Sequence, residues 1–209
     1  MDQHTIELVG TLFAVLITAM IGPSVVEYVK AKVNKSKDDI DPVKQELKQS
    51  CIINEELEEI REKLNADRVW ITVIHNGGHF LHSNRSMQKF SVLYEVEKPG
   101  VSTIGMVFTN IPVSLFTKSI QHISSGEHIL IENVDDYKKS TYGLKSALES
   151  VGTKAAMSKG LFDIETDSLI GTIGADYIAP KKISESDLKY FLSKSERLSG
   201  YISNFIKKI

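Results

Sequence analysis

Three histidines lie within eight residues of one another, around a pair of glycines, in the stretch VWITVIHNGGHFLHSNRS (69–86). They are His75, His79 and His82, and the glycines are Gly77 and Gly78. Imidazoles are common zinc ligands and acid–base groups, so the spacing raises metal binding and proton transfer as candidate chemistries. For a metal site the three rings would have to converge, and the segment would then curl back past the two glycines.

We favour a structural interpretation of the same stretch. Residues 68–74 are mostly β-branched or aromatic and predict a strand, and the sequence Asn76-Gly77-Gly78 predicts a turn after it, in which the glycines supply positive φ. The stretch contains no carboxylate, and the adjacent glycines exclude the helical HExxH arrangement. We therefore predict neither a metal site nor a catalytic site here.

The polar groups of this loop form instead a candidate surface for a ligand or a protein partner. Arg85 and Lys89 can receive an anionic group, and Asn76 and the backbone amides beside it are further donors. Loops on rigid scaffolds often carry function. The candidate surface comprises His75, Asn76, Gly77, Gly78, His79, His82, Arg85 and Lys89.

Composition limits the remaining classes. The 209 residues suffice for one domain with an appendage, and a net charge of −2 argues against a nucleic-acid partner. The single cysteine, Cys51, rules out an internal disulfide or a multi-cysteine metal cluster. Neither a G-x-S-x-G elbow nor a phosphate-binding G-x-x-x-x-G-K-[ST] motif is present. We predict a protein without enzymatic activity and without a cofactor.

The amino-terminal segment predicts a membrane-spanning helix over residues 1–29. Residues 8–26, LVGTLFAVLITAMIGPSVV, carry no charge, and as a helix they cover roughly 28 Å, close to the thickness of a bilayer's hydrocarbon core. A cleaved signal peptide would have positive charge before the apolar run, whereas Asp2 and Glu7 precede this one. A buried soluble helix is the other alternative.

A basic linker over residues 30–41 follows, with Lys30, Lys32, Lys35 and Lys37. Lysines beside a span stay on the cytoplasmic side, so we expect a single-pass protein of a cell inner membrane with its carboxy-terminal domain in the cytoplasm. The bilayer is thus a predicted partner, and the lysines can rest on anionic headgroups.

Residues 42–209 predict one α+β domain. The order of elements is a helix over 42–65, strands over 68–74 and 90–96, a helix over 112–124, a strand over 128–131, a helix over 144–150, a hairpin over 153–178 and a helix from 184 onward. This order predicts an antiparallel sheet with helices on one face. The apolar stripe from Ile53 to Leu64 suits packing on that sheet, which we favour, or a helix seam in a homodimer.

At this point the sequence resembles a GAF domain, a relative of PAS sensor domains, across about residues 42–208. The resemblance lies in the leading helix DPVKQELKQSCIINEELEEIREKLNADRVW, the paired strands around LYEVEKPG, and the closing hairpin and helix LIGTIGADYIAPKKISESDLKYFL. It implies a small-molecule pocket or a protein-contact surface on one face of the sheet, coupled to the membrane helix. The NKFDE signature and the chromophore cysteine of other GAF domains are missing, so cyclic nucleotide and bilin are not expected as ligands.

A second hypothesis assigns the sequence to a different functional class of protein. One amino-terminal span followed by a small α/β domain is also the layout of T-even phage holins, and the tail LIGTIGADYIAPKKISESDLKYFLSKSERLSGYI is similar to the end of that family. The resemblance implies a lysis protein with a periplasmic domain, against the lysine bias of the linker. The side of the membrane that holds the domain separates the two readings.

Overall fold

The computed structural model describes residues 27, 41–137 and 143–206. The chain divides into two compact units, Met1–Lys48 and Gln49–Ile209. The predicted membrane helix and basic linker, apart from Glu27 and Asp41, lie outside the described residues. None of the helices in the described part combines the length and the apolar character that crossing a bilayer requires.

The second unit contains a six-stranded sheet in the order β3-β2-β1-β6-β5-β4, and all neighbouring strands are antiparallel. The predicted antiparallel α+β architecture is confirmed. The strands are β1 (Arg68–His79), β2 (Ser86–Glu97), β3 (Ile111–Pro112), β4 (His128–Ile131), β5 (Ala155–Phe162) and β6 (Leu169–Tyr177).

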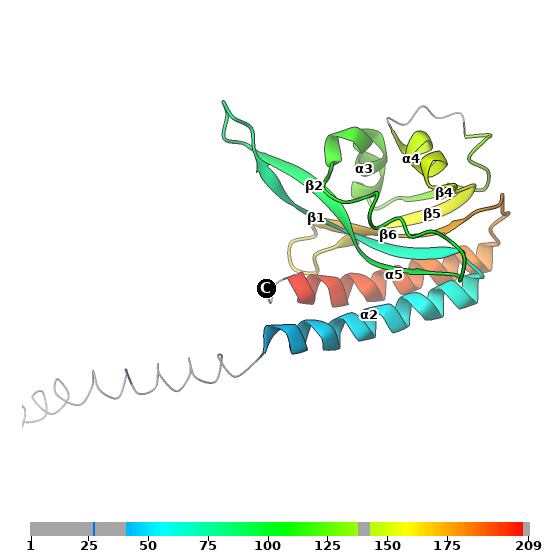
Figure 1. Ribbon diagram of the computed structural model, residues 1–209, viewed down its shortest axis with the longest axis horizontal. Helices are drawn as coiled ribbons and strands as arrows, with labels where there is room; N and C mark the ends of the chain where they lie inside the picture. Colours follow the sequence, from blue (N-terminus) through cyan, green and yellow to red (C-terminus); the bar gives the residue numbers. More distant parts are fainter. Residues whose placement is uncertain (1–26, 28–40, 138–142, 207–209) are drawn as a thin grey trace, which may run out of the picture. The chain divides into compact units, whose positions relative to one another are not determined.

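Helices cover both faces of this sheet, so the prediction of helices on one face was wrong. The long helices α2 (Pro42–Leu64) and α5 (Glu185–Ile206) lie on one face, and α3 (Thr117–Ser124) and α4 (Leu144–Ser150) on the other (Figure 1). The 3-10 turn η1 (Val113–Phe116) leads into α3. The sheet needs cover on both faces because β1 is apolar on both: Val69 and Ile71 point to the long helices, and Trp70 points to the other side.

The main core lies between the sheet and the long helices. In α2, Ile53, Leu57, Ile60 and Leu64 are at most 2 % exposed, so this stripe packs on its own domain as predicted. The Nζ of Lys194 on α5 lies 3.1 Å from Glu56 Oε2 and 2.7 Å from Glu59 Oε2 on α2. The homodimer seam stays a prediction.

Side-chain caps are present at the starts of both long helices. Asp41 Oδ1 accepts a hydrogen bond from the backbone N–H of Val43 at 3.0 Å, at the start of α2. Ser184 Oγ accepts one from the N–H of Asp187 at 3.1 Å, at the start of α5. The sequence rules for helix starts therefore hold at both long helices.

Candidate functional site

A cavity of about 100 Å³ lies between the sheet and the short helices α3 and α4. Strands β1, β2 and β6 form its floor, the short helices form its roof, and the segment between β2 and β3 closes one wall. Its lining is mostly apolar and includes Ile74, Phe90, Ile104, Phe116, Ile120, Ile123 and Leu148. Such a chamber favours a ligand with a large apolar surface.

Two polar atoms of the cavity wall have no hydrogen-bond partner within the described residues. One is the hydroxyl of Ser119 on α3, a residue only 5 % exposed, and the other is the indole Nε1 of Trp70 on β1. The indole nitrogen nevertheless lies close enough to Asp176 to lower the pKa of that carboxyl group. Because an unpaired buried donor costs free energy, both groups are available to a ligand acceptor.

On the floor of the cavity, the large side chain of Trp70 lies over a glycine of the neighbouring strand. Trp70 is paired with Gly174 across β1 and β6, and a Cβ at Gly174 would come within 2.1 Å of the indole ring. Beside it, Thr72 Oγ1 and Thr172 Oγ1 lie 2.7 Å apart and form a hydrogen bond. These two hydroxyls are already paired, so the floor offers a ligand mainly the indole ring and its N–H.

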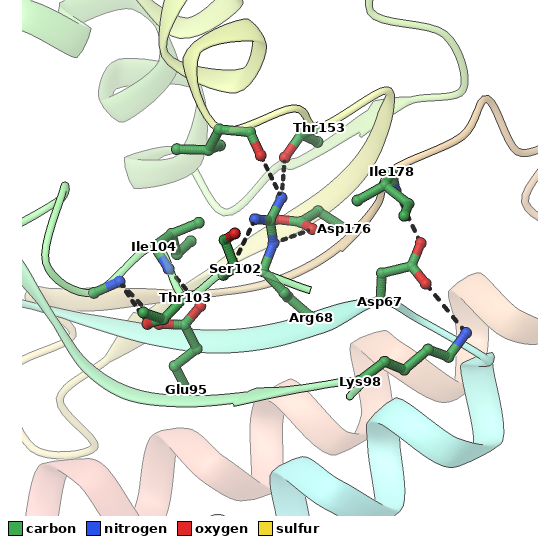
Figure 2. Close-up of polar contacts among 12 residues, drawn as sticks. Asp67, Arg68, Glu95, Lys98, Ser102, Thr103, Ile104, Thr153, Asp176 and Ile178 are labelled. Atoms are coloured by element: carbon green, nitrogen blue, oxygen red, sulfur yellow. Dashed lines mark hydrogen bonds and ion pairs between the residues drawn. The ribbon is translucent and has the colours of Figure 1, made fainter. Parts of the chain in front are cut away.

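A buried ion pair closes the end of the cavity. Arg68 Nε donates to Asp176 Oδ1 at 2.8 Å, and the side chains of both residues are at most 3 % exposed (Figure 2). The other guanidinium nitrogens donate to the carbonyl oxygens of Ser102 (3.0 Å) and Val151 (3.1 Å) and to Thr153 Oγ1 (2.8 Å). Burial raises the pKa of Asp176, and the charge and hydrogen bond of Arg68 oppose that rise.

Glu95 fixes the wall formed by the segment between β2 and β3. Its Oε1 accepts a hydrogen bond from the N–H of Ile104 at 2.7 Å, and its Oε2 accepts one from the N–H of Gly105 at 2.8 Å (Figure 2). The hydroxyl of Thr103 donates to the same carboxylate. The carboxylate thereby holds the 3 % exposed side chain of Ile104 against the cavity.

The histidine stretch lies elsewhere, on an extended hairpin. β1 continues through both glycines to His79, so the predicted turn at residues 76–78 was wrong. The pairing register shifts between Asn76 and His79, and Gly78 has φ of +110°, which is the geometry of a β-bulge rather than of a turn. The chain reverses only over residues 80–85, where the N–H of Phe80 bonds the carbonyl of Arg85 at 2.9 Å.

The eight predicted surface residues are only partly brought together. His75 stands opposite Lys89 and hydrogen-bonds Ser91 Oγ at 2.9 Å, and the Lys89 side chain crosses over Gly77. Asn76 Oδ1 accepts bonds from the N–H of Gly78 and the hydroxyl of Ser86.

The other three predicted residues, His79, His82 and Arg85, are exposed. Within the described ranges no three His, Cys, Asp or Glu side chains are grouped in a way that could hold a metal ion. What the hairpin residues bind stays a prediction.

The cavity residues had not been singled out from the sequence. They come from elements spread over residues 70–176, and an apolar residue that lines a cavity has the same pattern as one that fills a core. One signal was present: Ser119 interrupts the apolar face that Phe116 at the end of η1 shares with Ile120 and Ile123 of α3. A serine at such a position is a candidate cavity-facing donor.

Solved structures similar to this chain include GAF domains. The blue-light-absorbing form of the PixJ GAF domain of Thermosynechococcus elongatus superposes with a TM-score of 0.60 at 15% identity, covering 77% of this chain and 89% of that one. A GAF domain of Synechocystis sp. PCC6803 in its photoproduct state gives 0.58 at 15% identity, covering 77% and 98%. A domain of a two-component sensor histidine kinase protein of Sinorhizobium meliloti 1021 gives 0.52 at 21% identity, covering 75% and 92%.

Sequence comparison adds nothing further, since no family model and no curated protein matches the chain. At these identities the structural likeness establishes the fold alone. The carboxy-terminal part of this protein therefore has a GAF-like fold.

Proposed function

We propose that this protein is a membrane-anchored regulatory protein without enzymatic activity, whose cytoplasmic GAF-like domain senses a small ligand in the cavity under α3 and α4. The observation that carries the proposal is Ser119, a 95% buried position whose hydroxyl faces an apolar cavity without a partner in the described chain. The neighbouring folds include domains of photoreceptors and of a sensor histidine kinase protein, which supports a sensory role by analogy.

The cavity defines the ligand by chemistry. Apolar walls favour a hydrocarbon body, and the hydroxyl of Ser119 and the indole N–H of Trp70 favour one or two acceptor atoms on it. The volume of about 100 Å³ is somewhat below the ~150 Å³ of an engineered cavity that takes up benzene. We therefore propose a neutral compound of about one ring with a carbonyl or ring-nitrogen acceptor.

A bilin, such as the biliverdin bound in one of the neighbouring structures, fits this cavity less well. A chromophore of several rings exceeds the cavity, and Cys51, the one cysteine of the sequence, lies exposed on α2, across the sheet from the cavity. The hairpin that carries His75 to Lys89 remains our candidate for a separate contact surface.

The ligand proposal is tested with the chain's own fluorophore. Trp70 is the only tryptophan and lines the cavity, so its emission reports occupancy. We expect acetophenone to shift the Trp70 emission and raise the melting temperature of the full chain in mild detergent, and ethylbenzene, which lacks the acceptor, to do so less.

Two leucine substitutions on α4 provide the matched controls. Ala147 lines the cavity, so Ala147→Leu should abolish both responses to acetophenone, whereas Ser146→Leu on the exposed side should keep them. Equal responses in the two variants would place the binding elsewhere and refute the cavity as the site.

Anchoring and topology need a separate test. A reporter fused after Ile209 should be active in the cytoplasm, and the chain should stay with membranes in alkaline carbonate. A periplasmic reporter, together with abrupt growth arrest on expression, would favour the phage holin alternative instead. Extraction by carbonate would overturn the anchor.

A further inference from the structure

The hairpin that carries the histidines extends beyond the sheet. The last pair between β1 and β6 is Val73 with Gly171, so the residues after it in β1 pair only with β2. Figure 1 shows this part, residues 75–89, projecting from the domain. We call it the hairpin arm. Its side-chain hydrogen bonds are local or reach only Ser91, so the rest of the domain does not cover its tip.

Two large apolar side chains stand at the tip of the hairpin arm. Phe80 is 52 % exposed and Leu81 is 94 % exposed. The backbone around them is ordered, since the N–H of Phe80 bonds the carbonyl of Arg85 and the N–H of Asn84 bonds the carbonyl of Phe80, both at 2.9 Å. The turn thus holds an aromatic and an aliphatic group outward, where they gain nothing from the core.

The charge of the hairpin arm has one sign. Residues 75–89 contain Arg85, Lys89 and three histidines but no Asp or Glu, in a chain that has 27 acidic residues in all. A protruding apolar tip surrounded by cationic groups is complementary to an anionic lipid surface, where the apolar groups enter the acyl boundary and the cations meet the phosphates.

The linker allows the hairpin arm to reach the membrane that the proposed anchor would span. Within the second unit, β1 runs back along the sheet against the direction of residues 49–64 of α2 (Figure 1). The hydroxyl of Ser50, near the start of that segment, lies 3.4 Å from the hydroxyl of Tyr94 on β2. Only residues 30–41 separate α2 from the predicted span, and twelve residues reach at most about 40 Å.

The geometry points to a second membrane contact: the hairpin arm inserts Phe80 and Leu81 into an anionic bilayer, with Arg85 and Lys89 at the headgroups. This inference rests on the proposed membrane anchor. The contact would hold the GAF-like domain in a defined orientation on the membrane.

The test places an environment-sensitive label beside the tip. In a Cys51→Ser background, Ser83→Cys carries the fluorophore NBD and leaves both apolar residues in place. Ser186→Cys at the start of α5, also an exposed serine but at the opposite end of the domain, is the matched control. The full chain is reconstituted into vesicles of phosphatidylcholine and of an equal mixture of phosphatidylcholine and phosphatidylglycerol.

We expect the label at position 83 to shift to shorter wavelength and to be quenched by brominated lipid in the mixed vesicles, and the label at position 186 to do neither. The pair Phe80→Ser and Leu81→Asp should abolish the shift, and Arg85→Gln with Lys89→Gln should reduce it to the level seen in phosphatidylcholine. If, in mixed vesicles, the NBD label at position 83 emits at the same long wavelength as the label at position 186, the inference is overturned. A protein partner would then be the remaining candidate for contact with the hairpin arm.

The flotation of the same samples separates this inference from the anchor. Chain that floats with pure phosphatidylcholine vesicles while the label at 83 stays polar supports the anchor and refutes the arm contact. Chain that floats only with the anionic vesicles, with the label shifted, supports the arm contact and refutes the anchor.

Discussion

Replacing Ser119 by alanine should make the ligand-free protein more stable. Most serine-to-alanine changes at buried positions remove a hydrogen bond, but the hydroxyl of Ser119 makes none within the described chain. The residue as a whole is only 5 % exposed. Alanine removes the desolvated donor, and it is also the better helix former within α3.

The magnitude follows from these two contributions. An unsatisfied buried hydroxyl costs about 1 to 3 kcal/mol, and the helix propensity of alanine exceeds that of serine by roughly 0.5 kcal/mol. Taking the lower end of the first range, because the cavity gives the hydroxyl some freedom, we expect a gain of about 1.5 kcal/mol. For a chain of this size that corresponds to about 4 °C in melting temperature.

Ser203 supplies the matched control. It is also helical, is 2 % exposed, and donates a hydrogen bond from its hydroxyl to Asp163 Oδ2 at 3.0 Å. Ser203→Ala gains the same propensity but loses a bond to a carboxylate that is worth about 1.5 to 3 kcal/mol, so it should destabilise by about 1 to 2.5 kcal/mol. The two substitutions are thus expected to have opposite signs.

Urea unfolding of the full chain in mild detergent, followed by Trp70 emission, measures both variants. The midpoint should rise for Ser119→Ala and fall for Ser203→Ala, with unchanged slopes. Acetophenone should narrow or reverse the advantage of Ser119→Ala, because the variant lacks one of the two donors proposed to meet the ligand. If both variants lose stability to the same extent, the hydroxyl of Ser119 has a partner in solution and the reasoning is wrong.

Three further outcomes follow from the buried contacts. Arg68→Met should cost about 3 kcal/mol or more in urea unfolding, since it leaves the carboxylate of Asp176 unpaired in the interior. Burial raises the pKa of Asp176 above its value in the unfolded chain, so the contribution of this group to the free energy of unfolding is greatest in acid and is lost as the pH rises through the folded pKa. When the free energy of unfolding is measured from pH ~4 upward, we expect it to decline in the unsubstituted protein and to lack that decline in Asp176→Asn. Gly171→Ala should destabilise by about 3 kcal/mol, because its Cβ would lie 2.0 Å from the backbone oxygen of Thr72, whereas Gly126→Ala, with open space around it, should show only the backbone strain of its φ of +84°.

The elements of the domain could be predicted where local physics decides them. The stripe from Ile53 to Leu64 recurs at helical spacing and is buried, and the cap at Ser184 marks the start of α5. Both signals depend on residues close in sequence. The placement of the short helices on the second face could not be predicted in the same way, because it depends on which side of each strand needs cover.

The Gly77-Gly78 pair shows how a local signal misleads. Two adjacent glycines after Asn76 have the composition of a tight turn, and a turn was predicted. The long pairing of β1 with β2 carries the strand through them, with the positive φ of Gly78 accommodated in a bulge. The length of the hairpin arm depends on cross-strand pairs such as His75 with Lys89. The sequence alone does not reveal which residues pair across two strands.

The guanidinium of Arg68 has a mechanical consequence for the roof of the cavity. It holds the carbonyl at the end of α4, the hydroxyl of Thr153 and the carboxylate of β6 at once, and it stands at the first residue of β1. A displacement of α4 would break the hydrogen bond from the guanidinium to the carbonyl of Val151, while the contacts with Asp176 and Ser102 would remain. The lost contact costs free energy in the buried interior, so the end of α4 and the start of β1 are expected to move together.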